Sequence, residues 1–348
     1  MSESKKYKVF FNKDKKTGKK IKNKIDKYGF CIVENVLSKS IVNSLIKELK
    51  VANNKINKNI QNIIDCEKKG ISANDIYKKK LAHLRLQKNK HRPPKAVHDL
   101  VWMPKFAKAI ASSNILECIK IILDDHVRLS QFHTKIIRKQ KQKRFFYLDI
   151  MKTLRPTGYD KNLRDWHTDW PHDPWGGGPT AKTNLGSLKE PFPDVTMSLT
   201  VIWFLTDIKK KGGTIVIPGS HKRKKSPRSL NINLYKPLKN EITVSASSGS
   251  VLIQDSRLWH SPPPSSIDEN RIAVINRWSP WWMSINDYAY DCITNVMCRP
   301  LSKREFKKLP KKLQPSMVHL IPDLKENLTK EIINRSYLSI KNSLKKKN

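Results

Sequence analysis

The pattern of hydrophobic and polar positions predicts a helical part at residues 28–126 of the chain. A short apolar strand, YGFCIVENVL, is followed by a segment whose apolar residues recur at helical spacing. Those apolar positions are Ile41, Val42, Leu45 and Leu49. Ser38 or Ser40 stands where a helix N-cap is expected. Further helical patterns cover 106–111 and 115–123, so this part is expected to pack as helices around a strand.

After His126 the pattern changes to short segments rich in β-branched and aromatic residues, most of them bounded by Gly, Pro, Asn or Ser. These segments are LSQFHTKII, FFYLDIMKTL, VTMSLTVIWFLT, GTIVIPG, EITVSAS, SVLIQD and RIAVINRW. Many strands with few helices between them predict an antiparallel sandwich or jelly roll, not a parallel βαβ sheet. From about residue 286 onward, helical patterns return.

The expected organisation is therefore a basic tail at 1–27 and one domain at 28–348. That domain divides into a helical front (28–126), a β core (about 127–285) and a helical C-terminal part (286–348), which makes the fold class mixed α+β. With 348 residues, 38% of them hydrophobic, the chain has ample material for a buried core.

Several features favour a cytoplasmic protein. No run approaches the roughly 18 apolar residues of a membrane span, and the N-terminus lacks the apolar stretch of a signal peptide. The five cysteines are scattered and form no CxxC pair, which suits a reducing compartment better than a disulfide framework or a thiolate zinc site.

The charge favours an anionic partner without identifying it. Lys and Arg exceed Asp and Glu by 69 − 30, or +39, and such a field attracts polyanions. However, the excess is mostly Lys accompanied by Asn and Ile, as an AT-rich genome also produces. The basic runs are dispersed and are not interleaved with aromatic residues as in a single-strand binding platform. Nucleic acid therefore stays an open but unfavoured partner, beside an anionic small molecule.

The stretch DWHTDWPHD (165–173) carries the candidate chemistry. In a strand, His167 and Asp169 project to one face because successive side chains alternate. A third ligand would come from elsewhere in the sheet, and His260 ends the strand pattern SVLIQDSRLWH. Two His and one carboxylate suit non-haem Fe(II) with open coordination positions. His-x-Asp alone is weak, since surface polar residues form the same pattern by chance.

Arg271 strengthens the metal hypothesis. It follows His260 by 271 − 260 = 11 residues, at the start of the strand RIAVINRW. An Arg there can direct its planar guanidinium at the far carboxylate of a dicarboxylate cosubstrate. Taken alone, the same residue also fits an ion pair at a sheet edge.

The segments WHTDW, GGTIVIPGSHK (212–222) and SGSVLIQDSRLWH (248–260), with Arg271, resemble the phytanoyl-CoA dioxygenase family of Fe(II)- and 2-oxoglutarate-dependent oxygenases. The likeness extends from YGFCIVENVLSKSIVNSLIKEL to RPLSKREFKKLPKKLQPSMVHL, about residues 25 to 325. It implies a double-stranded β-helix, a cupin-like jelly roll with the metal inside one open end and helices on both flanks.

Residue by residue, the resemblance makes His167, Asp169 and His260 the iron ligands and catalytic centre. Arg271 matches the residue that binds the C5 carboxylate of 2-oxoglutarate, and Trp203 lies near an aromatic that lines the cosubstrate pocket. Pro262 stands where some members have Ser. The missing hydroxyl must then come from Thr153, Ser198 or Thr200, which stay alternatives, and Lys152 is a further candidate for the pocket.

The implied reaction uses Fe(II), 2-oxoglutarate and O2, with ascorbate as an expected stimulant. One oxygen atom enters a C–H bond of the substrate, and the other enters the succinate that forms with loss of CO2. Related halogenases lack the carboxylate ligand, so Asp169 favours hydroxylation. Two alternatives are an oxygenase acting on nucleic acid or an associated protein, and a non-catalytic jelly-roll binding protein. The sequence does not specify the substrate or the oligomeric state.

Neighbouring residues receive other interpretations. We expect Asp165, His172 and Asp173 to be loop or pocket-rim residues, and His221 to belong to a turn. Arg277 shares the strand face of Arg271, but its distance from His260 fits the family less well. The run WGGGP (175–179) is expected to form a flexible lid, because no strand and helix surround it as in a phosphate loop.

Overall fold

The structure is a computed structural model that describes most of the chain. The described residues are 3–12, 15–70, 97, 100–137, 145–148, 154–157, 162–173, 188–209, 212–263, 271–283 and 301–321. Lys152, Thr153, the predicted lid 175–179 and the segment 322–348 lie outside these ranges.

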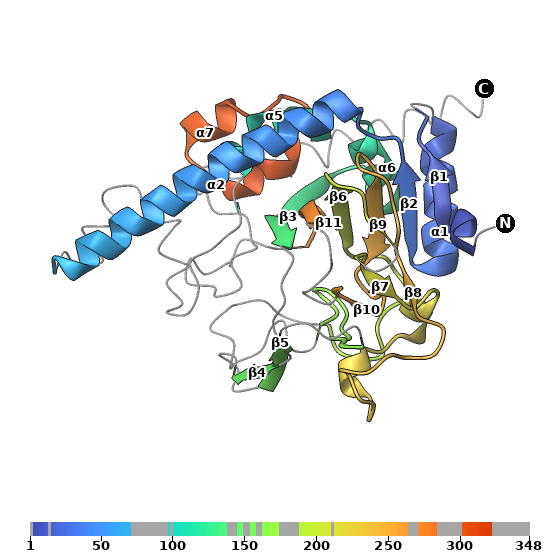
Figure 1. Cartoon of the computed structure of the whole chain (residues 1–348). Helices are drawn as coiled ribbons and strands as arrows, with labels where there is room; N and C mark the ends of the chain where they lie inside the picture. Colours follow the sequence, from blue (N-terminus) through green and yellow to red (C-terminus); the bar gives the residue numbers. More distant parts are fainter. Residues whose placement is uncertain are drawn as a thin grey trace, which may run out of the picture.

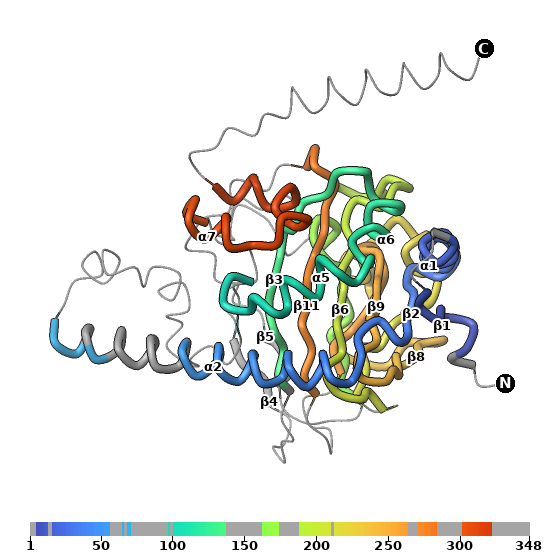
Figure 2. Tube along the Cα trace, turned by 90° about the horizontal axis from the view of Figure 1, so that it is seen from above, coloured from blue at the N-terminus to red at the C-terminus, as the bar shows by residue number. Residues whose placement is uncertain are grey.

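A six-stranded sheet forms the centre of the molecule (Figures 1 and 2). Its strands, in spatial order, are β1 (Lys8–Phe10), β2 (Phe30–Glu34), β9 (Val251–Asp255), β6 (Leu199–Phe204), β11 (Arg271–Pro280) and β3 (Val127–Ile137). All neighbouring strands are antiparallel except β1 and β2, which run parallel. Strands distant in sequence therefore lie side by side, as β6 does between β9 and β11.

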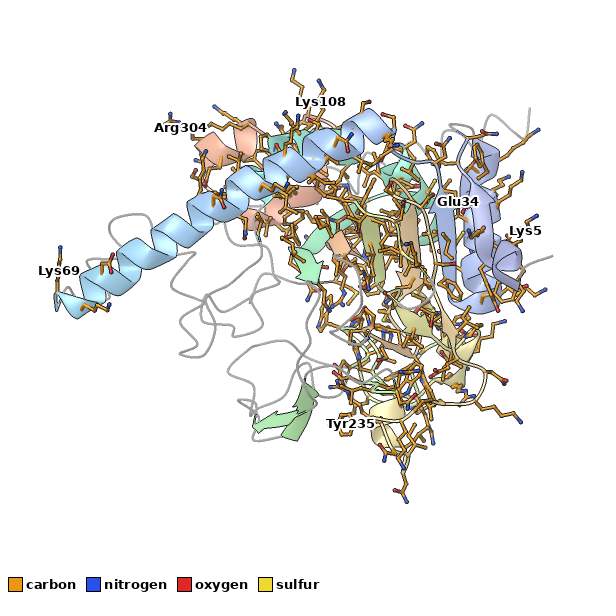
Figure 3. All side chains as sticks on the ribbon, viewed as in Figure 1. Lys5, Glu34, Lys69, Lys108, Tyr235 and Arg304 are labelled. Atoms are coloured by element: carbon orange, nitrogen blue, oxygen red, sulfur yellow. The ribbon has the colours of Figure 1, made fainter. Side chains whose placement is uncertain are left out.

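Helices cover one face of this sheet, here called the outer face. They are α2 (Lys39–Lys68), α5 (Pro104–Ser112) and α6 (Ile115–Ile122), and the short 3-10 helix η3 (Leu100–Trp102) lies between α2 and α5 in the chain. Helix α2 crosses the strands and continues past the sheet, so that Lys69 lies far from the body (Figures 2 and 3). Ser38 precedes α2, and its hydroxyl accepts a hydrogen bond from the Ile41 amide at 3.4 Å, as expected of an N-cap.

The opposite, inner face packs against a smaller sheet made of β10 (His260–Ser261), β7 (Ile215–Val216) and β8 (Ile242–Thr243). Alternate residues of β6 divide between the two faces: Val201 packs with the helices, whereas Ile202 packs with Val216 of the smaller sheet. Gly213, just before β7, allows the chain to pass close to a neighbouring strand. A Cβ there would lie 1.6 Å from the Val244 carbonyl oxygen.

The N-terminal segment corrects one expectation. Residues 3–12 and 15–28 do not form a tail: they contribute η1 (Glu3–Tyr7), the edge strand β1 and helix α1 (Lys15–Tyr28). Within α1, Ile21 and Ile25 are buried. This amphipathic pattern is difficult to recognise in the sequence because lysines occupy most positions of the segment. Only a few apolar residues remain to mark the face that packs against the protein.

The remaining elements are short. The segment FFYLDIMKTL, expected as a single strand, contributes to two antiparallel strands, β4 (Phe145–Leu148) and β5 (Leu154–Thr157). The 3-10 helices η4 (Ser220–Arg223) and η5 (Pro227–Ser229) follow β7, and α7 (Lys303–Lys307) and η6 (Gln314–Leu320) come last. In the described part of the chain, no helix is both long and apolar enough to cross a bilayer.

The fold is thus mixed α/β with a large, mainly antiparallel sheet, and that part of the expectation is confirmed. A closed jelly roll remains a prediction, favoured by the way the two sheets face each other across Ile202 and Val216.

Candidate metal centre

Three potential metal ligands meet where the segment 165–173 joins the smaller sheet. His167 and His260 form an antiparallel bridge, with each backbone N–H donating to the carbonyl of the other at 3.0 Å. The imidazole centroids are 4.2 Å apart, and the His260 Nε2 lies 3.7 Å from the Asp169 Oδ2. One potential ligand atom from each of the three residues lies within 4.8 Å of the others, so a single ion can contact all three.

Backbone carbonyls orient both imidazoles. The Nδ1 of His167 is 2.7 Å from the Asp165 carbonyl oxygen, and the Nδ1 of His260 is 2.9 Å from that of Leu258. A carbonyl oxygen can only accept, so Nδ1 is the donor in both contacts and Nε2 is the nitrogen left for a metal, the arrangement of metal-binding histidines. Burial and the adjacent His260 lower the pKa of His167, which keeps that ring neutral at physiological pH.

Asp169 is held as a carboxylate by three donors on the inner face of the large sheet. The Thr200 hydroxyl donates to Oδ2 at 2.7 Å, and the Gln254 amide lies 3.4 Å from the same oxygen. The Arg277 Nη2 lies 2.5 Å from Oδ1. Burial opposes ionisation, but Arg277 and then the two imidazoles outweigh it and bring the pKa of Asp169 far below its ordinary value. The carboxylate is therefore available as an anionic ligand.

Arg271 lies on the same face but has different partners. Its Nη1 donates to the Gly212 carbonyl at 3.0 Å, its Nη2 to the Thr214 hydroxyl at 3.2 Å, and its guanidinium lies 5.6 Å from the Phe204 ring centroid. Burial lowers the pKa of Arg271 to about 10, so the group stays cationic. Within the described part of the chain, no carboxylate pairs with it, and its buried Nε has no hydrogen-bond partner.

Thr214 relates Arg271 to the metal centre. It lies two residues before Val216, the partner of His260 in the smaller sheet. Thr214 and the His260 position are therefore separated by roughly 7 Å along the strand, at about 3.4 Å per residue. The Arg271 guanidinium is thus bound next to β7, the strand that pairs with His260.

Trp203 does not face this centre, which corrects the expectation that it lines a cosubstrate pocket. Its side chain is on the outer face of β6, where it packs edge-on against Phe106 and donates to the Asn276 side chain at 2.6 Å. The next residue, Phe204, points to the inner face and contacts Arg271. Neighbouring residues of a strand point to opposite faces of the sheet. The position of Trp203 in the sequence therefore does not determine whether its side chain faces the metal centre.

The other candidates for the cosubstrate pocket remain predictions. The hydroxyl of Thr200 contacts Asp169 and also accepts from the Arg277 Nε at 3.2 Å, so the contacts that the structure shows belong to the carboxylate. Ser198 is buried, and its hydroxyl has no hydrogen-bond partner in the described part of the chain.

The acidic residues around the centre have structural partners. Arg228 lies 3.4 Å from both the Asp165 and the Asp173 carboxylates and so connects the two ends of DWHTDWPHD.

Two further histidines near the centre are not metal ligands in this cluster. His172 is fully buried, with its Nδ1 2.9 Å from the Ser256 hydroxyl, and lies outside the metal-ligand cluster. His221 belongs to η4, where its ring is 2.7 Å from the position of a Cβ on Gly29.

Three contributors to the site were missed or discounted from sequence: Arg277, Gln254 and Arg228. Arg277 lies on the same strand face as Arg271, and strand alternation in the sequence indicates this. The number of residues between each Arg and His260, however, favours Arg271. Gln254 and Arg228 carry no sequence signal of this kind, because their contacts depend on how β9 and η5 pack against residues 165–173.

Two histidines and one carboxylate that converge in this way form a potential metal site of the two-histidine, one-carboxylate class. The model of the phytanoyl-CoA dioxygenase (PhyH) family matches residues 25–268, more than half of the chain. The chain therefore belongs to this family. No curated protein sequence matches it.

Two solved structures illustrate the similarity. HygX from Streptomyces hygroscopicus, with nickel and 2-oxoglutarate bound, is 14% identical, with 76% of this chain and 87% of HygX covered and a TM-score of 0.42. The non-heme alpha ketoglutarate dependent epimerase SnoN from nogalamycin biosynthesis is 14% identical, with 77% and 84% covered and a TM-score of 0.43.

Proposed function

We propose that this protein is an Fe(II)- and 2-oxoglutarate-dependent oxygenase that hydroxylates a C–H bond of a small organic substrate. The observation that carries the proposal is the convergence of His167, Asp169 and His260, whose ligand atoms lie within 4.8 Å of one another. Both histidines direct their Nδ1 to backbone carbonyls, which leaves Nε2 for the ion. Imidazole and carboxylate ligands fit Fe(II), and the described cluster contains no thiolate that would favour zinc.

The protein residues would bind and orient the reactants. His167, Asp169 and His260 would hold one side of the ion, leaving the other side for ligands. Arg271 would bind the distal carboxylate of 2-oxoglutarate, since it is a buried cation without a carboxylate partner in the described residues. When bound, Fe(II) supplies the activation of O2 that couples loss of CO2 from the cosubstrate to oxidation of the substrate.

Hydroxylation is the outcome that Asp169 supports. Substrate C–H, O2 and 2-oxoglutarate would give the hydroxylated product, succinate and CO2, with one oxygen atom in each of the first two products. A carboxylate that is held by Thr200 and Arg277 occupies a position that a halide would otherwise need. The charge of +39 favours an anionic substrate.

The test is substrate-dependent formation of succinate by the purified protein. Fe(II), O2 and 2-oxoglutarate are supplied with fractionated metabolite extracts, and succinate is measured with the mass of any new product. We expect His167→Ala and Asp169→Ala to abolish succinate formation, and Arg271→Ala mainly to raise the 2-oxoglutarate concentration required. His126→Gln, at a histidine outside the metal-ligand cluster, is the matched control.

Full turnover by His260→Ala would show that the ligand set is wrong. Absence of Fe(II) binding by the unmodified protein would favour a non-catalytic jelly-roll protein. An affinity for DNA or RNA that persists near physiological salt and falls steeply as salt rises would instead support a nucleic-acid substrate.

A further inference from the structure

His172, the last histidine of DWHTDWPHD, is enclosed by protein and does not belong to the metal-ligand cluster. Its Nδ1 lies 2.9 Å from the Ser256 hydroxyl, and its ring packs edge-on against Phe192, with the ring centroids 4.9 Å apart. Its buried Nε2 has no hydrogen-bond partner in the described part of the chain. The one polar contact of the His172 ring that the structure shows is therefore the contact with Ser256.

Hydrogen bonds close the turn from Thr168 to His172 on both sides of Asp169. The Asp169 amide donates to the Ser256 carbonyl at 2.8 Å, and the His172 amide donates to the Asp169 carbonyl at 2.8 Å. The Thr168 hydroxyl donates to the His172 carbonyl at 2.7 Å. Ser256 thus holds the turn at two points, the backbone of Asp169 and the ring of His172.

Ser256 is itself part of the large sheet. It directly follows β9, and its amide donates to the Ser198 carbonyl, next to the start of β6, at 3.0 Å. The same two strands supply the Gln254 and Thr200 side chains that donate to the Asp169 carboxylate. Backbone and carboxylate of Asp169 are therefore both fixed to β6 and β9, and His172 closes the backbone side of this arrangement.

We propose that His172 is a positioning residue that acts through Ser256 to hold the Asp169 carboxylate within reach of the ion bound by His167 and His260. The Asp169 Oδ2 lies 3.7 Å from the His260 Nε2, and a shift of the turn would change this separation. Residues that orient a metal ligand without touching the metal contribute to metal affinity in this way. The inference rests on the metal site of the proposed function.

The test measures Co(II) binding in competition with a chromophoric chelator, together with the visible absorption bands of the bound ion, which report on its coordination. The variants are His172→Phe, His172→Asn, His172→Gln and Ser256→Ala. Asn places a polar atom near the position of Nδ1, whereas Gln places one near that of Nε2. Ser250→Ala is the matched control, because it removes a buried serine hydroxyl at the other end of β9.

We expect His172→Phe and Ser256→Ala each to lower the Co(II) affinity by about tenfold and to change the visible bands. His172→Asn should keep most of the affinity, His172→Gln should resemble His172→Phe, and Ser250→Ala should bind Co(II) as the unmodified protein does. Because His172 acts through the Asp169 carboxylate, His172→Phe should cause no further loss in an Asp169→Asn background.

Unchanged Co(II) affinity and bands in Ser256→Ala and His172→Phe overturn the inference, as does an equal loss with and without the Asp169 carboxylate. Either result would assign His172 to packing against Phe192. If His172→Phe does not fold, Ser256→Ala decides alone, because it keeps the ring and the Ser256 carbonyl. Failure of the proposed function looks different: the unmodified protein would then bind no Co(II), which would overturn both.

Discussion

Replacing Arg277 by Met should expose how strongly Asp169 depends on its cationic partner. The Arg277 and Asp169 side chains are only 8% and 13% exposed, and Nη2 lies 2.5 Å from Oδ1, so water screens the pair little. Removing one partner of a buried pair typically costs about 3–5 kcal/mol, because the other charge is left uncompensated. Thr200 and Gln254 still donate to Asp169. We therefore expect the lower end, about 3 kcal/mol of unfolding free energy in the metal-free protein.

The assay is urea unfolding of four proteins in a chelating buffer: unmodified, Arg277→Met, Asp169→Asn and the double variant. If the cost arises from the unpaired carboxylate, Arg277→Met should cost much less in the Asp169→Asn background. Added metal should also stabilise Arg277→Met more than the unmodified protein, since the ion replaces the lost positive charge. Equal costs in both backgrounds would refute the reasoning and assign the role of Arg277 to packing.

Three further outcomes follow from contacts of the site and its scaffold. Thr200→Val should weaken Fe(II) binding about tenfold in a chelator competition, because the hydroxyl that donates to Asp169 is lost. Thr200→Ser keeps a hydroxyl and should bind Fe(II) as the unmodified protein does. Equal Fe(II) affinities of Thr200→Val and the unmodified protein would contradict the role of this hydrogen bond. Because burial and the charge of Arg271 lower the pKa of Lys135 to about 8, the Lys135 ammonium should titrate near pH 8 when followed by NMR, and Lys135→Arg should remove this transition. Gly213→Ala should prevent folding, because the added Cβ would lie 1.6 Å from the Val244 carbonyl oxygen. The Cβ of Gly219→Ala would meet no atom within 4 Å, so this control should lower the free energy of unfolding by only about 1 kcal/mol, measured by thermal unfolding.

The local features of this protein can be predicted from residues that are close in sequence. His167 and Asp169 share a side because side chains alternate, and Thr168 between them points away to donate to the His172 carbonyl at 2.7 Å. The strands around Val201, Ile253 and Val274 follow from runs of β-branched residues, and the helix after Ser38 from its cap and apolar spacing. Each of these depends on bonds and side-chain directions within a few residues.

Contacts between strands that are far apart in the chain required the three-dimensional structure. Arg277 reaches Asp169, and Lys135 lies diagonally from Arg271, only because β11 pairs with β3 and β6 in one particular register. A change of one residue in that register would turn each of these side chains to the opposite face.

Trp203 demonstrates this limit, since it packs among the helices while Phe204 contacts Arg271. The lysine-rich segment that forms α1 is a second case, because two buried isoleucines become visible as a helix face only against the sheet they cover. Alternation along a strand is a local property, but which face is buried and which strands are neighbours depends on how the whole chain packs.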